Sequence, residues 1–313
     1  MRHLKQAAFV LLSCALVLGA ARWFPEAEQE APPSAALPEV YVYEGYAAST
    51  EAGFDEKSLQ YAARKFQQLY DDYLTANAGH IYLSVIPDKG GFTVPPEGYA
   101  PASAQETAEA LLSALDFVRY ADIAPLLTLE DYYRTDPHWR QERLRPVAQA
   151  LADAMGVSLP DTAEESLHTL AGEFCGSYWG KTAEPLAADI LSYITSPLLD
   201  GCAVYDYETD STGGVYDLTA AEKAPYDLFL SGSKALLRIE NPAAGNDRTL
   251  IVFRDSFGSS LIPLLAQGYG TVYAVDIRYL ATDALARVVT FPEEADVLLV
   301  YSATVLQNSV TLK

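Results

Sequence analysis

Histidine, cysteine and basic side chains are scarce in this chain of 313 residues, and each shortage excludes a class of function. The chain has only four His and three Cys, and none of their spacings is of the kind that a zinc site requires. No glycine-rich phosphate loop precedes a predicted helix, so we expect neither a metal nor a nucleotide cofactor. The 21 Lys and Arg face 42 Asp and Glu, and the formal net charge of −21 would repel DNA and RNA.

Long hydrophobic runs are also missing, apart from a short one at the amino terminus. A basic segment, residues 1–5, precedes an apolar stretch at 7–21 that ends in small residues, which is typical of an export signal. The stretch is short for a stable membrane span, which needs about 20 residues. We predict a signal peptide or N-terminal membrane anchor at 1–24 and a flexible linker, rich in Glu, Ala and Pro, at 25–39. The protein is therefore expected outside the cytoplasm, either secreted or held to the membrane only by this segment.

Cysteine usage agrees with export. Because Cys14 lies in the leader, the remainder of the chain retains only Cys175 and Cys202. An oxidising compartment could join this pair in a disulfide, and two separate buried thiols are the alternative.

Residues 40–313 have the composition of one α/β domain. Half of the chain is hydrophobic, which is enough for a full core. A region rich in Tyr, Asp, Gly and Ser, 175–226, is predicted to be an insertion or an active-site lid. Elsewhere strand-like and helix-like patterns alternate, which indicates a mainly parallel sheet with helices on both faces. The predicted strands are 81–86, 235–239, 249–253, 271–275 and 296–301, and the predicted helices are 57–76, 105–120 and 140–155.

A serine follows one of these strands directly. Ser256 lies between the apolar run 249–253 and a helix that is predicted to open at about Ser259. A side chain in such a turn stands at the carboxyl end of a sheet, beside the free N–H groups of a helix amino terminus. The alternative is that Asp255 and Ser256 only cap the helix.

An Asp-x-His step supplies the matching base. In an extended or turn segment Asp136 and His138 project the same way, and Pro137 between them stiffens the loop. The structural alternative is a lone histidine with no chemical role. Taken together with Ser256, the pair provides the nucleophile, base and orienting carboxylate of serine acyl transfer.

At this point the sequence resembles a known family. The segment 133–139, Tyr-Arg-Thr-Asp-Pro-His-Trp, resembles the signature of the bacterial DHHW proteins, with Pro137 in place of the second histidine. Further blocks follow in the family's order and cover most of the chain from about Val40, at 86–89, 226–232, 254–258 and 275–279. That family is similar to the SGNH-hydrolase-like proteins that O-acetylate alginate and other exported polysaccharides.

The resemblance implies an SGNH-hydrolase-like three-layer fold and a set of roles. By position, Ser256 would be the nucleophile, His138 the general base and Asp136 its orienter. Gly232 would line the oxyanion hole together with the Ser256 N–H. Asp255 takes the place of the Asp before the serine, and the SGNH asparagine has no clear counterpart.

Further candidates could contact substrate. Lys89, Arg134 and Arg278 stand at family-like positions and could each hold a hydroxyl, a carboxylate or an acyl oxygen, or could form structural salt bridges. Aromatic residues could stack on sugar rings or could pack in the core; they are Trp139, Tyr178, Trp179 and, in the 226–232 block, Tyr226.

The predicted function is O-acetyl transfer through Ser256, His138 and Asp136 to a cell-surface or exported polysaccharide or cell-wall glycan. The resemblance implies a membrane-bound O-acyltransferase as the source of the acyl group. Water as acceptor would make the same site a carbohydrate esterase. A non-catalytic polysaccharide-binding or assembly protein on the same scaffold is the remaining alternative.

Overall fold

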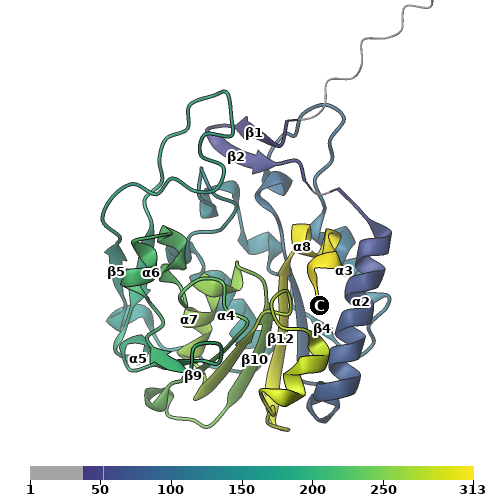
Figure 1. The fold of residues 1–313 in the computed structure, drawn as a ribbon, viewed down its shortest axis with the longest axis vertical. Coiled ribbons are helices and arrows are strands. Elements are labelled where there is room, and N and C mark those ends of the chain that lie inside the picture. The colour runs from purple at the N-terminus through teal and green to yellow at the C-terminus, as the bar shows by residue number, and fades with distance from the viewer. Residues whose placement is uncertain (1–37, 52) are drawn as a thin grey trace, which may run out of the picture. The chain divides into compact units, whose positions relative to one another are not determined.

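An eight-stranded sheet lies at the centre of the part of the chain that the structure describes (Figure 1). The computed structural model describes residues 38–51 and 53–313, so the predicted leader and most of the linker lie outside the described residues. In spatial order the strands are β4 (Arg119–Tyr120), β3 (Ile81–Ile86), β12 (Ala295–Ser302), β10 (Thr249–Arg254), β11 (Thr271–Val275), β9 (Leu236–Glu240), β7 (Ala203–Asp206) and β8 (Ser211–Gly213).

The sheet is mainly parallel. The first five strands in this order run parallel to one another, whereas β9, β7 and β8 join through antiparallel pairing. Strand β10 lies between two parallel neighbours, with Val252 opposite Leu298 on one side and Ala274 on the other. All six of its residues are buried, and its four central residues, 250–253, form a continuous apolar run, as expected for a strand that is covered on both faces.

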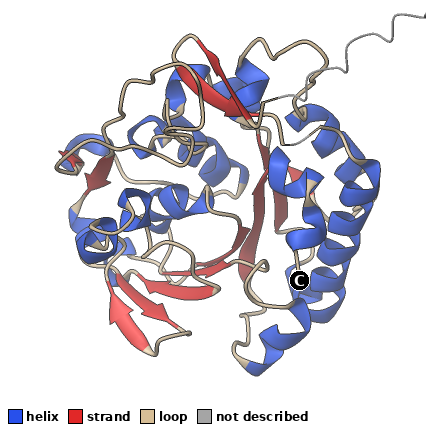
Figure 2. Cartoon of the chain, turned by 45° about the horizontal axis from the view of Figure 1, so that its top comes forward, coloured by secondary structure: helices blue, strands red, loops and turns tan. Residues whose placement is uncertain are grey.

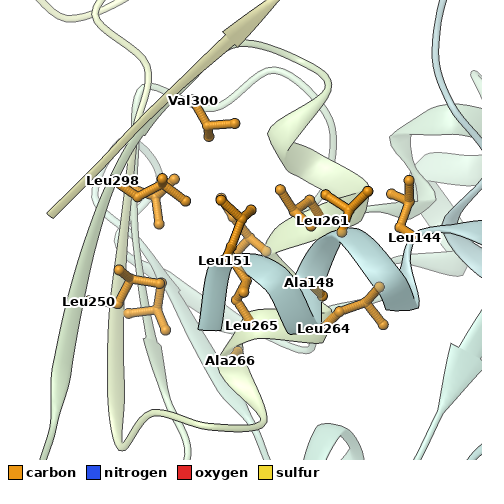
Figure 3. Packing of buried hydrophobic residues seen from close by; sticks show 14 of the residues in the cluster. Leu144, Ala148, Leu151, Leu250, Leu261, Leu264, Leu265, Ala266, Leu298 and Val300 are labelled. Carbon is orange, nitrogen blue, oxygen red and sulfur yellow. The ribbon is translucent and has the colours of Figure 1, made fainter. Parts of the chain in front are cut away.

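Helices cover both faces of the sheet, and the alternation of side chains along β10 explains the two layers (Figure 2). Leu250 and Val252 pack in one cluster with residues of α4 (Arg145–Ala154) and α7 (Gly258–Ala266), as Figure 3 shows for Leu250. Ile251 and Phe253 point the other way, into a cluster with α2 (Glu56–Leu69) and α3 (Ala104–Leu112). The predicted α/β class is confirmed.

Some helix boundaries differ from the predicted ones. Helix α4 begins at Arg145 instead of 140, because the chain first makes a 3₁₀ turn at Gln141–Arg143 and Pro146 then occupies the first turn of the helix. Helix α3 ends at Leu112, and Arg119 and Tyr120, which were predicted to be helical, form a short strand that pairs with β3. The hydrophobic periodicity of the sequence reveals neither the start of α4 nor the end of α3.

The region 166–226 contributes to several parts of the fold. Strands β5 (Ser166–Thr169) and β6 (Ser192–Thr195) pair with each other, and α5 (Pro197–Asp200) and α6 (Leu218–Ala221) follow them. Strands β7 and β8 of the same region extend the central sheet. A separate hairpin joins β1 (Val40–Tyr43) and β2 (Tyr46–Ser49), and α8 (Ala303–Gln307) follows β12.

The cysteines do not form the predicted disulfide. Cys175 is exposed and Cys202 is buried, and both are free thiols. The Sγ of Cys202 donates a hydrogen bond to the carbonyl of Leu198, 3.3 Å away, and burial raises the pKa of this thiol to about 11. The two side chains therefore belong to different surroundings, which spacing in the sequence cannot reveal.

No helix within 38–51 and 53–313 is both long enough and apolar enough to cross a bilayer.

Candidate active site

Ser256 lies in the short turn between β10, which ends at Arg254, and α7, which begins at Gly258. Because β10 has parallel neighbours on both sides, the carboxyl ends of three strands meet at this edge of the sheet. Functional groups of α/β proteins gather at such an edge. The structure places Ser256 in a strand-to-helix turn, as the sequence predicts.

Asp255 holds this turn in place and is fully buried. Its Oδ1 accepts a hydrogen bond from the N–H of Phe257 at 3.0 Å, and its Oδ2 accepts one from the N–H of Ser302 at 2.7 Å. The first bond closes a local turn around Ser256, and the second fastens that turn to the end of β12. Asp255 therefore fixes the backbone from which the Ser256 hydroxyl projects.

The glycine that closes the Arg-Asp-Ser-Phe-Gly block is explained by the arginine that opens it. The Arg254 side chain is fully buried and lies against Gly258, where a Cβ would come within 2.7 Å of the Arg254 Cβ. The guanidinium donates to the Oγ of Ser259 at 2.9 Å. The block is thus one packed unit, with the serine at its turn.

A second loop brings the histidine to this turn. Tyr132 and Trp139 pair across the loop that contains Asp136 and His138. The Trp139 indole N–H is within 3.0 Å of both the Phe257 carbonyl and the Ser260 Oγ, so it ties the loop to the start of α7. Trp139 is fully buried, and the prediction that it contacts substrate is therefore wrong.

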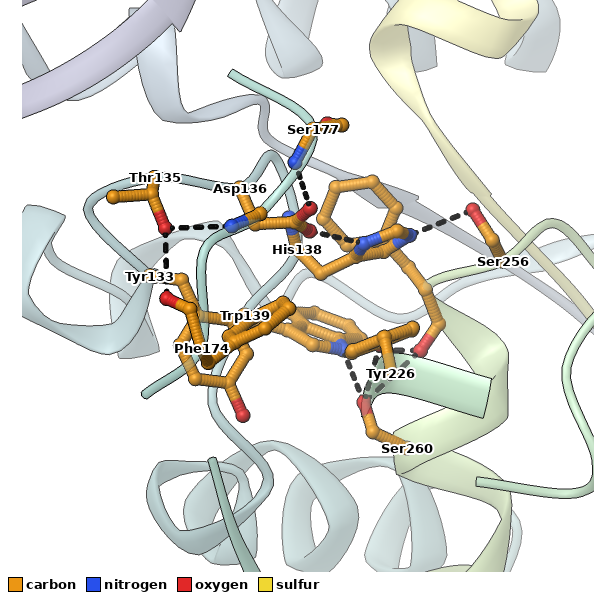
Figure 4. A network of polar contacts seen from close by, with 12 residues as sticks. Tyr133, Thr135, Asp136, His138, Trp139, Phe174, Ser177, Tyr226, Ser256 and Ser260 are labelled. Carbon is orange, nitrogen blue, oxygen red and sulfur yellow. Dashed lines mark hydrogen bonds and ion pairs between the residues drawn. The ribbon is translucent and has the colours of Figure 1, made fainter. Parts of the chain in front are cut away.

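The two loops place Ser256, His138 and Asp136 in one chain of hydrogen bonds (Figure 4). The Nε2 of His138 lies 2.8 Å from the Oγ of Ser256, and its Nδ1 lies 2.6 Å from the Oδ1 of Asp136. Asp136 also accepts from the backbone N–H of His138 at 3.2 Å and, on Oδ2, from the N–H of Ser177 at 2.9 Å. The three residues that the sequence singled out are thus brought together.

The charge on Asp136 selects which nitrogen of the His138 ring carries the proton in the neutral tautomer. Burial alone would raise the pKa of Asp136, but attraction to His138 and the hydrogen bonds from His138 and Ser177 outweigh it and lower the pKa to about 2. An ionised carboxylate can only accept, so Nδ1 of His138 must carry a proton. Nε2 of the neutral ring is then free to accept the proton of the Ser256 hydroxyl.

Two aromatic rings flank the imidazole. The Tyr226 ring stacks on His138 with centroids 4.0 Å apart and planes 13° apart, and Phe257 lies 4.8 Å away. The Tyr226 hydroxyl is 3.0 Å from the Ser260 Oγ, and burial raises its pKa far above the usual range. Tyr226 therefore supports the base, and its predicted contact with substrate stays a prediction.

One of the two predicted oxyanion donors is not available. The N–H of Gly232 donates to the carbonyl of Phe229 at 3.1 Å. Gly232 has a φ of 79°, and a Cβ there would come within 2.4 Å of an Asp227 carboxylate oxygen, which accounts for the glycine. The N–H of Ser256, by contrast, donates to no acceptor in the described residues, and this group can face an oxyanion.

The basic candidates differ in what they contact. Arg278 is held by Asp276, with nitrogen to oxygen distances of 2.7 and 2.9 Å, so the salt-bridge alternative holds for it. The ammonium of Lys89 is buried against backbone carbonyls of the loop that contains Asp136 and His138, which we call the base loop. The prediction that Lys89 holds a substrate group is therefore wrong. Arg134 is exposed, with its guanidinium carbon 5.2 Å from the centre of the Tyr46 ring.

Three residues of the region 175–226 hold the base loop in place, and the sequence did not indicate them. Gly176 sits against Asp136, and the N–H of Ser177 binds its carboxylate. Asp189 accepts hydrogen bonds from the N–H groups of Arg134 and Thr135 at 2.8 Å each. No motif marks these positions, because their contacts with the loop of Asp136 join groups that lie 41 to 55 residues apart along the chain.

Gly176→Ala is expected to lower activity by displacing Asp136. A Cβ at this position would lie 2.3 Å from the Asp136 Cβ and 2.6 Å from the Thr135 carbonyl, so one of the two segments must move. Overpacking of this kind costs about 1–3 kcal/mol of stability. The check is kcat/KM beside the thermal unfolding midpoint, with Gly91→Ala as a control, since a Cβ there meets nothing within 4 Å. Unchanged kcat/KM in a folded Gly176→Ala protein would contradict this account of the contact.

Within 38–51 and 53–313 no group of three or more His, Cys, Asp or Glu is arranged to hold a metal ion.

Comparisons with known proteins find similarity at the level of the fold. A scan against protein-family models and a search of curated proteins give no match. Among solved structures, a DHHW family protein from Eubacterium siraeum matches with a TM-score of 0.66 and 21% identity, over 87% of this chain and 92% of the other. Bacillus cereus PatB1 with a sulfonyl adduct matches with a TM-score of 0.66 and 17% identity, over 85% and 95%.

A third solved structure carries an activity in its name. The O-acetyltransferase domain of Pseudomonas putida AlgJ matches with a TM-score of 0.50 and 16% identity, over 86% of this chain and 92% of that one. At these identities the matches speak for the fold, and the resemblance found in the sequence is confirmed at that level. This chain has an α/β fold with a mainly parallel sheet, similar to the folds of the DHHW family protein and of the AlgJ O-acetyltransferase domain.

Proposed function

We propose that this protein is an exported serine O-acyltransferase that moves an acetyl group to a hydroxyl of a cell-surface or exported polysaccharide. The observation that carries the proposal is the continuous chain of hydrogen bonds from Asp136 through His138 to Ser256, with distances of 2.6 and 2.8 Å. Its support from outside the chain is the fold shared with an O-acetyltransferase domain.

The first half-reaction loads the serine. As the Ser256 Oγ attacks the carbonyl carbon of a donor ester, its proton passes to Nε2 of His138, and the Ser256 N–H stabilises the oxyanion. Asp136 holds the imidazolium that forms. The donor alcohol then leaves with the proton from His138, and the acetyl group remains on Ser256.

The second half-reaction repeats these steps with a sugar hydroxyl as nucleophile. The hydroxyl gives its proton to His138 and attacks the acetyl-serine, after which Ser256 leaves as the alcohol. The His138 side chain is 14% exposed, and aromatic rings flank the imidazole. Restricted access for water favours a bound hydroxyl over hydrolysis.

The partners in this proposal are the glycan acceptor and a membrane-bound O-acyltransferase that supplies the acetyl group. A place outside the cytoplasm, set by the predicted signal or anchor at 1–24, would bring the enzyme to both.

The test measures where the acetyl group goes. The protein is incubated with 4-nitrophenyl acetate, with and without soluble oligosaccharides, and nitrophenol release is followed beside the mass of the sugars. We expect the accepting sugar to accelerate release and to gain an acetyl group. Release with acetate as the only product would identify an esterase, and no release from the folded protein would favour a binding role.

A further inference from the structure

The turn that follows β3, Pro87-Asp88-Lys89, takes no part in the proposed chemistry and yet contains a buried cation. This cation is Lys89, a residue that is only 3% exposed. Its Nζ donates to the carbonyl of Tyr133 at 2.7 Å and to that of Asp136 at 2.8 Å, and it lies 3.4 Å from the carbonyl of Arg134. One ammonium group thus binds the backbone of the loop that carries the base.

This arrangement is unusual because carbonyl oxygens, and no carboxylate, directly bind the ammonium in the described part of the chain. Burial lowers the pKa of Lys89 to about 7, against the carboxylates of Asp136 and Asp189, which raise it. The Tyr178 ring lies 5.2 Å from Nζ. In either protonation state the amine keeps two N–H donors for its two short bonds.

The neighbouring residue, Asp88, holds the other side of the site. Its Oδ2 accepts a hydrogen bond from the N–H of Thr304 at 2.6 Å, just beyond the end of β12. Two residues earlier, the N–H of Ser302 binds Asp255, which fixes the turn of Ser256. Burial, aided by the charge on Asp255 and opposed by hydrogen bonds from Thr304, raises the pKa of Asp88 to about 7.

Adjacent residues of one turn therefore reach both halves of the site. Lys89 binds the loop of His138, and Asp88 binds the segment on which the loop of Ser256 rests. The turn itself is anchored, because β3 pairs with β12 along six residues, up to Ile86 opposite Ser302. We propose that Lys89 is a positioning residue that sets the distance between His138 and Ser256. This inference rests on the proposed function.

The side chain suits this task. An ammonium carries three N–H donors that point in different directions, so it can bind carbonyls that do not share a plane. Methionine at the same position would keep the length and the apolar stem and would lose every donor. The Tyr133 and Asp136 carbonyls would then lack their buried partner, and the loop would shift to find others.

The test measures the reactivity of Ser256 directly, with phenylmethylsulfonyl fluoride as probe. In this reaction the Oγ forms a bond to sulfur, fluoride leaves, and the serine proton passes to His138. We compare the wild type with Lys89→Met. A displacement of about 1 Å at reacting groups lowers rates on the order of 100-fold, so we expect a maximal rate of sulfonylation about 100-fold lower, with the half-saturating reagent concentration unchanged.

Arg248→Met is the control for general destabilisation, and Arg248, unlike Lys89, also pairs with the carboxylate of Asp296 at 2.7 Å. Arg248 also binds turn carbonyls, those of Gly156 at 2.7 Å and Met155 at 2.9 Å, but it precedes β10 and so lies at the opposite end of that strand from Ser256. We expect this variant to lower the unfolding midpoint and to leave the sulfonylation rate unchanged. If Lys89→Met and Arg248→Met lower the unfolding midpoint by similar amounts and only Lys89→Met slows sulfonylation, the loss of rate is due to positioning and not to general destabilisation.

The outcomes separate this inference from the proposed function. If the folded wild type does not form an adduct on Ser256, the proposed function fails. If the wild type reacts and Lys89→Met reacts as fast, or if Arg248→Met slows it equally, the positioning role is overturned. Should Lys89→Met not fold, Lys89→Gln takes its place: its side chain is one bond shorter, so it cannot reach both the Tyr133 and the Asp136 carbonyls with short bonds, and we expect slower sulfonylation. A wild-type rate in Lys89→Gln would show that these bonds do not set the reactivity of Ser256 and would overturn the inference.

Discussion

Ser256→Ala and His138→Ala are each expected to lower kcat for acetyl transfer on the order of 10⁶-fold, as the loss of a nucleophile or its base does in serine enzymes. The reason is that neither group works alone: the hydroxyl is a weak nucleophile until Nε2 of His138, 2.8 Å away, takes its proton. The double variant should therefore be no slower than either single variant.

The measurement is kcat with a soluble acetyl donor, for the wild type, both single variants and the double variant. Ser113→Ala is the control, since Ser113 is an exposed residue at the end of α3 that bonds only to its own helix. Losses that add up in the double variant, or a single variant with substantial activity, would show that the two residues do not act as one unit.

Asp136→Asn is expected to lower kcat on the order of 10⁴-fold without unfolding the protein. The Asp136 carboxylate accepts hydrogen bonds from His138 and from Ser177, and an amide has only one oxygen to offer. The amide nitrogen would donate to the imidazole and favour the tautomer with its proton on Nε2. That tautomer cannot accept the proton of Ser256.

The loss of kcat in Asp136→Asn is expected not to change with pH at values well above the pKa of Asp136. Because that pKa is about 2, the wild-type carboxylate stays ionised far above it, and the difference between wild type and variant should persist. Asp206→Asn is the control: Asp206 is also buried and binds a backbone N–H, but its partners are Glu208, Thr209 and Lys234. Equal losses of kcat in the two variants would contradict the assigned role.

The parts of this protein that could be predicted are those that depend on local pattern. The strands at 81–86 and 249–253 follow from apolar runs, and the turn of Ser256 follows from a strand that ends where a helix begins. Asp136 and His138 are two residues apart, so one stretch of chain carries their geometry.

The parts that could not be predicted depend on partners far along the chain. Gly232 was assigned to the oxyanion hole by its place in a motif, but its N–H closes a turn with Phe229. Cys175 and Cys202 suggested a disulfide by number alone, but one is exposed and the other buried. Lys89 looked free to bind substrate, because nothing in its own segment shows that carbonyls 44 and 47 residues away surround it.

The most direct test is the intact mass of the protein after brief exposure to 4-nitrophenyl acetate, followed by peptide mapping. The account predicts one acetyl group on Ser256 in the wild type and none in Ser256→Ala or His138→Ala. No adduct on a folded wild-type protein, or an adduct that Ser256→Ala retains, would contradict it.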